Sequence, residues 1–350
     1  MSPLRRACPT ARPRVLRSLL AGTLLALLAK PAAAEEITVY TTLLPTQLAP
    51  YTQSFRQSHP DISLKWMRDS SGVIAARLLS EGPRSQADVV FSLASENIIQ
   101  AGSADLLLPY KPAGYDEIDR KFKDKNDPPL WSGIFAYMAA ICFNTKEAQK
   151  RGIPTPKKWS DLLDPRFKGQ VTMPDPASSG TGFISVSGWL QKFGEGPGWD
   201  FMEKLHTNIA IYTHSGNKPC NSASSGEFVA GISYSSEGVL DKGRGAPIDV
   251  IFPEEGVGWA LSTVAILKSS KKQDAAKKFA DWAVSPAANK VYSEFWEVIA
   301  RPEQRRQSSN QAVDPSTLIT DNDHYWIASE RDRILKEWQS RFAGKRDPKP

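Results

Sequence analysis

Short apolar runs alternate with amphipathic segments along the first part of the chain. The runs at 37–40, 62–67 and 88–92 are typical of buried strands, and the segments at 47–58 and 73–79 have the apolar spacing of helices. Strands that alternate with helices at this spacing are typical of right-handed βαβ units on a parallel sheet. The pattern therefore predicts an α/β fold.

A longer apolar run at 133–143 has strand character and is long enough to pass from one domain into another. After it the alternation resumes, with strands expected at 170–173, 229–234 and 259–267 and helices at 182–193, 199–206, 274–284 and 323–343. No low-complexity linker separates the two sets, so we expect crossing strands to join two domains. The predicted parts are a first lobe at 35–134 and 261–302, a second lobe at 135–260, and a helical segment at 303–350 whose lobe is left open.

The first 34 residues have the pattern of an export signal. Five arginines precede an apolar run at 18–29, and the small residues at 32–34 follow it. Basic, apolar and small residues in this order are typical of a cleavable signal peptide. The run has 12 residues, fewer than the roughly 20 that a membrane-crossing helix needs. We therefore predict that residues 1–34 are a signal peptide, cleaved after Ala34, and that the protein is periplasmic.

The charge of the chain depends on this segment. The whole chain of 350 residues has a net charge of +6, but the first 34 residues hold six of its 44 basic residues and none of its 38 acidic ones. The remainder thus carries 38 charges of each sign and no net charge. A neutral chain gives no reason to expect nucleic acid as a partner, so any charged ligand must be held by local groups.

Cysteine and histidine are scarce. Cys8 lies in the predicted signal, which leaves Cys142 and Cys220, and these could form a disulfide or remain as two buried thiols. Neither a C-x-x-C pair nor a His-rich tract suggests a metal site. The sequence also lacks a G-x-S-x-G elbow, a phosphate-binding G-x-x-x-x-G-K-[ST] loop and an H-E-x-x-H motif. No catalytic residue is therefore predicted, although a hydrolase needs no fixed order of its catalytic groups.

Three predicted strand-to-helix turns, at 40–42, 69–72 and 176–182, are rich in Ser and Thr. The first N–H groups of a helix have no backbone partner and lie at the positive end of the helix dipole, so they bind anions. The same residues are also the ordinary helix caps, and one such turn alone predicts a cap. Several of them favour a ligand site, because ligands of α/β proteins lie outside the carboxyl ends of the strands.

Other polar and aromatic positions are weaker candidates. The turn at 212–220 contains His214, which is better explained as a hydrogen-bonded structural histidine. The acidic turn at 253–256 is explained as solvated or ligand-facing. Tyr137 and Tyr234 lie near predicted strand ends and are candidates for a pocket wall, although most aromatic residues at such positions belong to the core.

Several of these segments resemble a known family. Residues 159–169 resemble the segment that leads into the second lobe of periplasmic substrate-binding proteins of ABC importers, in the branch for ferric iron, thiamine and phosphonates. Residues 173–183 and 212–220 are most similar to 2-aminoethylphosphonate-binding proteins. The resemblance covers nearly all of residues 36–302 and implies a two-lobed, type II-like binding-protein fold with hinge-crossing strands.

The resemblance also implies a function and partners. The chain would be the solute-binding component of an importer, a monomer without a cofactor, which hands a small phosphonate or phosphate ester to an ABC permease and its ATPase. The anion oxygens would be held from both lobes, by Ser70, Ser71, Ser179, Gly180 and Thr181. The lobes would close over the ligand.

The chain departs from the family where an amine would be recognised. Relatives carry acids near the positions of Leu44, Ser235 and Ala260, which are neutral here. Glu237 and Glu254 stand where relatives tend to have basic residues. Either these glutamates bind the ammonium group in place of the missing acids, or the ligand has no ammonium group.

Ferric-iron binders of this branch usually present tandem tyrosines in the turn at 234–236, and only Tyr234 is present here. Iron, or another small anion, is therefore an alternative ligand, and a secreted phosphate-ester hydrolase is an alternative outside the class. The predicted ligand-binding residues are Thr42, Ser70, Ser71, Gly72, Ser92, Tyr137, Ser178, Ser179, Gly180, Thr181, Asn217, Tyr234, Glu237 and Glu254.

Overall fold

The computed structural model describes residues 34–304, 314–319 and 322–347. The predicted signal peptide lies outside the described residues, apart from Ala34. Within the described ranges, no helix has the length and apolar content that crossing a membrane requires.

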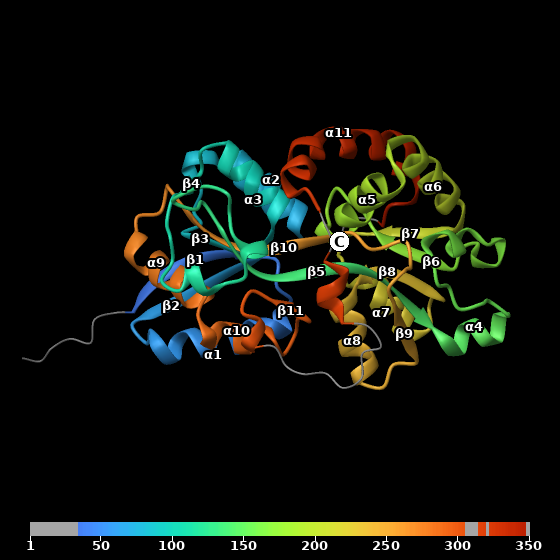
Figure 1. Cartoon of the computed structure of the whole chain (residues 1–350), viewed down its shortest axis with the longest axis horizontal. Helices are drawn as coiled ribbons and strands as arrows, with labels where there is room; N and C mark the ends of the chain where they lie inside the picture. Colours follow the sequence, from blue (N-terminus) through green and yellow to red (C-terminus); the bar gives the residue numbers. More distant parts are fainter. Residues whose placement is uncertain (1–33, 305–313, 320–321, 348–350) are drawn as a thin grey trace, which may run out of the picture. The chain divides into compact units, whose positions relative to one another are not determined.

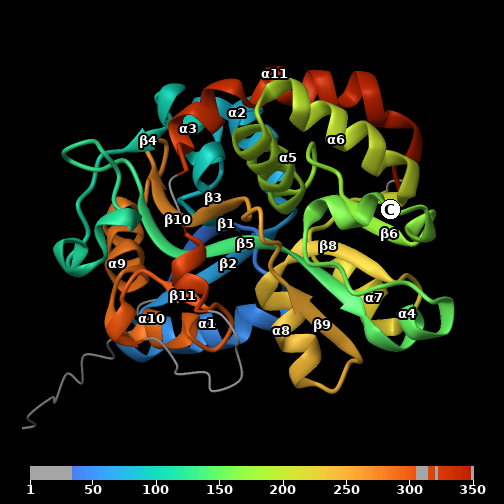
Figure 2. The same cartoon turned by 45° about the vertical axis from the view of Figure 1, so that its right-hand side comes forward.

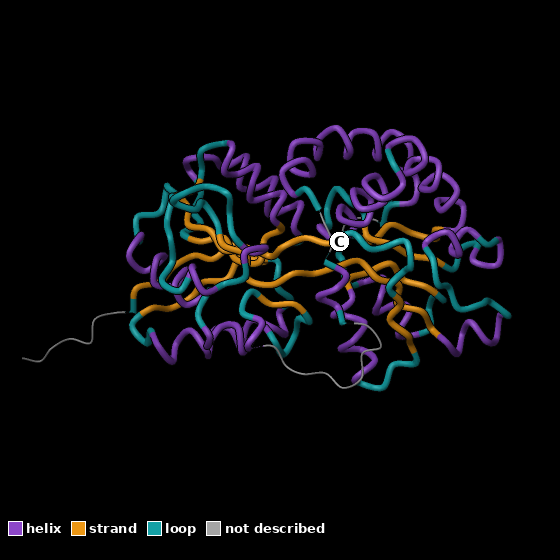
Figure 3. Tube along the Cα trace, in the orientation of Figure 1, coloured by secondary structure: helices purple, strands orange, loops and turns teal. Residues whose placement is uncertain are grey.

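The strands of the described chain are β1 (Glu35–Thr41), β2 (Ile62–Arg68), β3 (Val89–Ala94), β4 (Leu107–Leu108), β5 (Ser132–Asn144), β6 (Val171–Pro174), β7 (Ile209–Thr213), β8 (Ala230–Tyr234), β9 (Ile248–Ile251), β10 (Trp259–Leu267) and β11 (Val298–Ile299). Eight of them form one hydrogen-bonded path in the order β2-β1-β3-β10-β5-β8-β6-β7, while β4 pairs with β10, and β9 and β11 pair with β5. Figures 1 and 3 show the strands as a layer with helices above and below it. The outer pairs are parallel, as expected, but β10 is antiparallel to both β3 and β5. The parallel βαβ units predicted from the sequence are found in the outer parts of the sheet. Its centre differs, because β10 returns the chain from the second lobe to the first and so runs opposite to β5, which is also antiparallel to β8.

The helices of the described chain are α1 (Pro45–Ser58), α2 (Ser71–Glu81), α3 (Ser95–Ser103), α4 (Thr145–Arg151), α5 (Gly180–Phe193), α6 (Glu195–Asn208), α7 (Lys218–Ser225), α8 (Ser235–Gly243), α9 (Gln273–Ala283), α10 (Pro286–Tyr292) and α11 (His324–Phe342). The first lobe contains β1 to β4, β10 and β11 with α1, α2, α3, α9 and α10. The second contains β6 to β9 with α4 to α8 (Figures 1 and 2). The two-lobed α/β prediction is therefore confirmed.

The strand β5 joins the two lobes. Residues 132–138 pair with β10, and residues 139–143 pair with β8 of the second lobe. All 13 residues of β5 are buried, which explains why its sequence is a continuous apolar run without alternation. This strand crosses the predicted lobe boundary at residue 134, and the lobe boundaries themselves stay a prediction.

Alternate residues of the strands fill two cores on the two faces of the first lobe's sheet. On β3, Val89 and Phe91 pack with α1, α9 and α10, whereas Val90 packs with α2 and α3. Successive side chains of a strand point to opposite faces, so a strand covered on both sides is apolar throughout. This double covering holds the carboxyl end of β3 in a fixed position, where the candidate site begins.

The C-terminal helix α11 packs on both lobes. In the first lobe, the Gln100 side chain donates a hydrogen bond of 3.3 Å to the carbonyl of Ala328. In the second, the rings of Trp338 and Tyr212 meet edge-on with centroids 5.2 Å apart. Figures 1 and 2 show α11 passing over α3 and over α5 and α6. The helix, expected on the surface, thus has one buried face that spans the two lobes.

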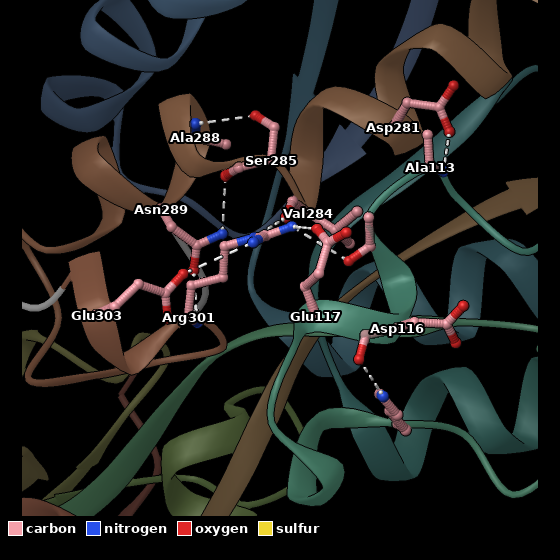
Figure 4. Close-up of polar contacts among 12 residues, drawn as sticks. Ala113, Asp116, Glu117, Asp281, Val284, Ser285, Ala288, Asn289, Arg301 and Glu303 are labelled. Atoms are coloured by element: carbon pink, nitrogen blue, oxygen red, sulfur yellow. Dashed lines mark hydrogen bonds and ion pairs between the residues drawn. The ribbon is translucent and has the colours of Figure 1, made fainter.

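A buried arginine ties the chain after β11 back to the first lobe (Figure 4). The Arg301 side chain is 7% exposed and pairs with Glu117 and Glu303. Its Nε donates to the carbonyl of Val284 at 2.7 Å, and its backbone N–H donates to Asn289 Oδ1 at 3.0 Å. A buried charge is tolerated when it is paired and hydrogen-bonded in this way.

Cys142 and Cys220 form a disulfide, with their Cα atoms 5.2 Å apart. Both are fully buried, and the bond fastens α7 to β5 within the second lobe. Of the two alternatives for this pair, the structure contains the bonded one. The start of α7 is thereby held next to the strand that joins the lobes.

Candidate functional site

A cavity lies between the two lobes and contains about 570 Å³ of space, its open mouth included. Sites for small molecules are typically concave clefts of this kind. The residues that line it are Thr42, Leu43, Leu44, Gln47, Arg68, Ser70, Ser71, Ser92, Ala94, Tyr137, Ser179, Gly180, Thr181, Gly216, Asn217, Tyr234, Ser262 and Trp296.

Six helices of the described chain begin at cavity-lining residues. The residues that precede their first turns are Leu44 for α1, Ser70 for α2, Ala94 for α3, Ser179 for α5, Asn217 for α7 and Tyr234 for α8. Each helix dipole places a partial positive charge at this end. The cavity is therefore surrounded by positive helix ends from both lobes and favours an anion.

The starts of α2 and α5 supply unpaired backbone donors. No carbonyl of the described chain accepts a hydrogen bond from the N–H of Ser71, Gly180 or Thr181. Such groups are the orphan donors of a helix start, and a bound anion or water satisfies them. Ser179 Oγ accepts from the N–H of Gly182 at 3.4 Å and is a cap, whereas Ser70 makes no side-chain cap bond. Of the two explanations for these serines, the cap fits Ser179, and the ligand group fits Ser70.

A second group of hydroxyls lies at the carboxyl end of β3. Thr42 Oγ1 donates its hydrogen to the carbonyl of Ser92, and Ser92 Oγ lies 3.4 Å from Ser262 Oγ. Ser92 has a φ of 66°, a left-handed conformation that is uncommon for a residue other than glycine. Because the Thr42 hydrogen is used, this oxygen faces the cavity as an acceptor.

Two aromatic rings form a wall of the cavity. Tyr234 of the second lobe and Trp296 of the first have ring centroids 5.8 Å apart. Trp296 stacks on Phe135 at 4.1 Å and donates through Nε1 to the Tyr51 hydroxyl at 3.1 Å. The Tyr234 hydroxyl donates to Glu237 Oε2 at 3.0 Å. Both rings are therefore fixed by partners outside the cavity.

The cavity carries little formal charge. Arg68 is the single charged residue among the described residues that line it, and its Nε donates to the Leu43 carbonyl at 3.2 Å. Burial raises the pKa of Tyr137 and of Tyr234 well above the ordinary value, and burial raises the pKa of the Glu96 carboxyl behind the cavity to about 7. The protein thus adds little negative charge that would repel an anion.

Ten of the predicted ligand-binding residues line this cavity. They are Thr42, Ser70, Ser71, Ser92, Tyr137, Ser179, Gly180, Thr181, Asn217 and Tyr234. The other four lie elsewhere. Glu237 lies behind the Tyr234 ring, whose hydroxyl donates to it. Glu254 is exposed, and its Oε2 lies 3.8 Å from Lys158 Nζ. Gly72 and Ser178 form a contact between the lobes. The described residues contain no cluster of three or more His, Cys, Asp and Glu side chains placed to hold a metal ion.

The contact between the lobes is a close one. The N–H of Gly72 in α2 donates to the carbonyl of Ser178 at 2.9 Å, and a Cβ atom on Gly72 would lie 2.2 Å from the carbonyl oxygen of Ala177. His214 Nε2 lies 3.6 Å from Asp69 Oδ1 across the same contact. Only a residue without a side chain permits this approach.

Eight lining residues were missed by the sequence analysis as ligand groups. They are Leu43, Leu44, Gln47, Arg68, Ala94, Gly216, Ser262 and Trp296. Arg68 comes directly before the predicted turn at 69–72, so its position was a usable signal. Ser262 and Trp296 reach the cavity through long-range pairing and packing, for which the sequence has no local signal.

The chain is similar to proteins of known sequence and structure. The model of a family described as bacterial extracellular solute-binding protein, whose members are binding proteins rather than enzymes, matches residues 85–326. An uncharacterized protein of Haemophilus influenzae is 32% identical over 82% of this chain and 85% of its own. The structure of the periplasmic binding protein AfuA from Actinobacillus pleuropneumoniae, with exogenous fructose-6-phosphate bound, is 29% identical with a TM-score of 0.83 over 89% of this chain and 99% of its own. Iron-bound HitA from Pseudomonas aeruginosa is 22% identical with a TM-score of 0.73, over 87% and 99%, which is a likeness of fold alone.

Proposed function

We propose that this chain, which belongs to the bacterial extracellular solute-binding proteins, binds a small phosphate ester. The rest of the ligand, called its body below, carries no charge. As the solute-binding component of an ABC importer, the chain captures a small solute in the periplasm and passes it to a permease and its ATPase. A monomeric state and cleavage after Ala34 belong to the same proposal.

The observation that carries this proposal is the convergence of six helix starts on one cavity. The phosphate oxygens would accept hydrogen bonds from the backbone N–H groups of Ser71, Gly180 and Thr181 and from the hydroxyls beside them. Ser71 belongs to the first lobe, and Gly180 and Thr181 belong to the second. A ligand that contacts both lobes stabilises the closed state, which is the ordinary way in which such a protein closes.

The neutral body follows from the remaining cavity walls. No carboxylate of the described chain lines the cavity, so an ammonium group would have no partner of opposite charge. Hydroxyls of the ligand would instead meet the oxygens of Thr42, Ser92 and Ser262, and its apolar face would lie against Tyr234 and Trp296. The fructose-6-phosphate bound to AfuA has this combination of a phosphate and an uncharged, hydroxylated body.

A phosphonate such as 2-aminoethylphosphonate is the second candidate. The resemblance of residues 173–183 and 212–220 to 2-aminoethylphosphonate-binding proteins favours it, and the donors proposed for a phosphate suit a phosphonate equally well. The two candidates differ at the body of the ligand. Glu237 is a buried acid behind the Tyr234 ring, and its carboxylate accepts a hydrogen bond from the Tyr234 hydroxyl.

A thermal unfolding panel tests the proposal. The purified mature chain is heated alone and with fructose-6-phosphate, fructose, 2-aminoethylphosphonate or ferric citrate. A ligand at 100 times its Kd stabilises the folded state by ~2.7 kcal/mol, so the phosphate ester should raise the Tm and fructose should not. A rise with ferric citrate alone would overturn the proposal, and a rise with 2-aminoethylphosphonate alone would select the second candidate.

Two further measurements complete this test. We call the part of the cavity at the starts of α2 and α5, where the phosphate is proposed to bind, the anion end. The double variant Ser179→Ala, Thr181→Ala removes two hydroxyls from it and should weaken binding of the phosphate ester at least tenfold without unfolding the protein. Unchanged affinity would mean that this turn only caps α5. The ³¹P spectrum of the ligand, recorded after long incubation, should show an intact ester, whereas release of inorganic phosphate would support the hydrolase alternative.

A further inference from the structure

Two buried residues at the start of α3 lie directly behind the anion end of the cavity. Glu96 is 1% exposed and Asn97 is 2% exposed. The amide nitrogen of Asn97, Nδ2, donates to Ser71 Oγ at 3.1 Å and to Glu96 Oε1 at 3.3 Å. Ser71 is a cavity-lining residue, so its hydrogen bond with Asn97 links Asn97 to the site.

The carboxyl of Glu96 determines which end of the Asn97 amide faces Ser71. An amide nitrogen is only a donor, and a carboxylate oxygen is an acceptor, so the nitrogen faces Glu96 Oε1. The same nitrogen then directs its second hydrogen to Ser71 Oγ. Glu96 Oε2 and Asn97 Oδ1 have no hydrogen-bond partner in the described part of the chain, so a proton on Oε2 leaves the bond from Asn97 Nδ2 to Oε1 in place.

The direction of this hydrogen bond fixes the role of the Ser71 hydroxyl. A serine hydroxyl has one hydrogen and two lone pairs, and here one lone pair is occupied by the Asn97 amide. The hydroxyl hydrogen cannot point toward Asn97. Gly180 lies on the other side of Ser71, so close that a Cβ atom added to Gly180 would be 3.3 Å from Ser71 Oγ. The hydrogen therefore points into the cavity, toward the place where the anion is proposed to bind.

We propose that Asn97 is a positioning residue that holds Ser71 as a hydrogen-bond donor to the bound anion, with Glu96 fixing the orientation of the Asn97 amide. This inference rests on the proposed function, because it requires an anion beside Ser71. The opposite arrangement exists in the same cavity, where the Thr42 hydrogen is used by the Ser92 carbonyl and Thr42 faces the ligand as an acceptor. The two supporting contacts thus give the two ends of the cavity opposite hydrogen-bonding character.

The variant Asn97→Asp reverses the direction of this bond. A carboxylate accepts the Ser71 hydrogen, and the serine then presents lone pairs to the anion. We expect affinity for fructose-6-phosphate to fall at least tenfold for Asn97→Asp and by less for Asn97→Ala, in which the hydroxyl can turn freely. Asn208→Asp is the matched control, because Asn208 is equally buried and its amide donates to backbone carbonyls away from the cavity.

A double-mutant cycle with Ser71→Ala separates positioning from a merely structural effect. If Asn97 acts through Ser71, Asn97→Asp and Asn97→Ala change affinity no more than about twofold in the Ser71→Ala background. An equal loss in both backgrounds, or the same loss for Asn208→Asp, would overturn the inference. If the unaltered chain binds neither phosphate ester nor phosphonate, the proposed function fails; if it binds one but the cycle shows no coupling, only this inference fails.

Discussion

The two ends of the cavity are built from different kinds of structure. At the anion end, α2 and α5 begin next to each other and offer backbone N–H groups whose positions are set by the helices themselves. At the other end, Tyr234 and Trp296 form a wall of side chains, each held by a hydrogen bond to a residue outside the cavity. The backbone end suits a feature that all phosphates and phosphonates share. The aromatic end suits the part of the ligand in which they differ, so affinity and selectivity should be separable by mutation.

Removing the disulfide should have the largest effect of these changes, because it lowers the stability of the lobe that holds one side of the anion end. Replacing both cysteines, Cys142→Ser with Cys220→Ser, releases α7, whose first residues lie beside the cavity. Loss of a native disulfide typically lowers the free energy of unfolding by ~2–5 kcal/mol. Denaturant unfolding of the variant and the parent measures this difference. Equal midpoints would mean that the bond contributes nothing to this lobe.

Glu96 should make the stability of the anion end depend on pH. Burial raises its pKa to about 7 in the folded protein, above the ordinary 4.5, so the folded state binds the proton more tightly than the unfolded state. The contribution is complete below about pH 4.5 and is lost as the pH rises through 7, and it amounts to ~3 kcal/mol at 1.36 kcal/mol per unit. The groups that face this carboxyl are Arg331 of α11 and Tyr137 of β5.

The variant Glu96→Gln isolates this effect, because glutamine does not titrate and can still accept from Asn97. We expect the free energy of unfolding of the variant, relative to the parent, to increase between pH 5 and pH 8. Denaturant midpoints at several pH values give this difference. A constant difference would mean that Glu96 does not titrate in this range.

Gly72→Ala tests whether the anion end requires closure of the two lobes. The added Cβ would lie 2.2 Å from the Ala177 carbonyl oxygen, and such overpacking costs ~1–3 kcal/mol in the closed state. Affinity for the phosphate ester should fall about 10- to 100-fold, while the Tm without ligand is kept or rises, because alanine favours a helix. Gly196→Ala is the control, since no atom lies within 4 Å of its added Cβ. Calorimetric titration of the three proteins decides this, and an unchanged affinity for Gly72→Ala contradicts the account.

Trp296→Ala should have the smallest effect and sharpens the comparison. Aromatic contacts contribute ~0.5–1.5 kcal/mol beyond burial, so affinity for fructose-6-phosphate should fall about 3- to 10-fold. Affinity for inorganic phosphate, which has no body to contact the wall, should stay the same. Competition titrations with the two ligands measure both values. An equal loss for both would show that Trp296 supports the whole cavity instead of one end.

The anion end was largely predictable from the sequence, because its signals are local. Each of the turns at 69–72 and 176–182 is adjacent in the chain to the helix that it starts, and a helix start has the same donors in any fold. The alternating strands and the crossing run at 133–143 were predictable for the same reason. Arg68 could have been added from its place beside one of these turns.

The aromatic end was not predictable in the same way. Trp296 follows α10 and reaches Tyr234 only after the chain has returned to the first lobe, and Ser262 reaches Ser92 only through the register of β10 on β3. The antiparallel centre of the sheet was missed for the same reason, since strand direction depends on which strands become neighbours. Long-range pairing therefore determines the part of the site that distinguishes ligand bodies.

The most direct test is an amide spectrum of the ¹⁵N-labelled mature chain, titrated with fructose-6-phosphate. The account predicts that the backbone N–H signals of Ser71, Gly180 and Thr181 shift as the ligand saturates the protein, while Gly196, remote from the cavity, does not. Saturation by the phosphate ester with these three signals unmoved would contradict the central claim that helix starts from both lobes hold the anion.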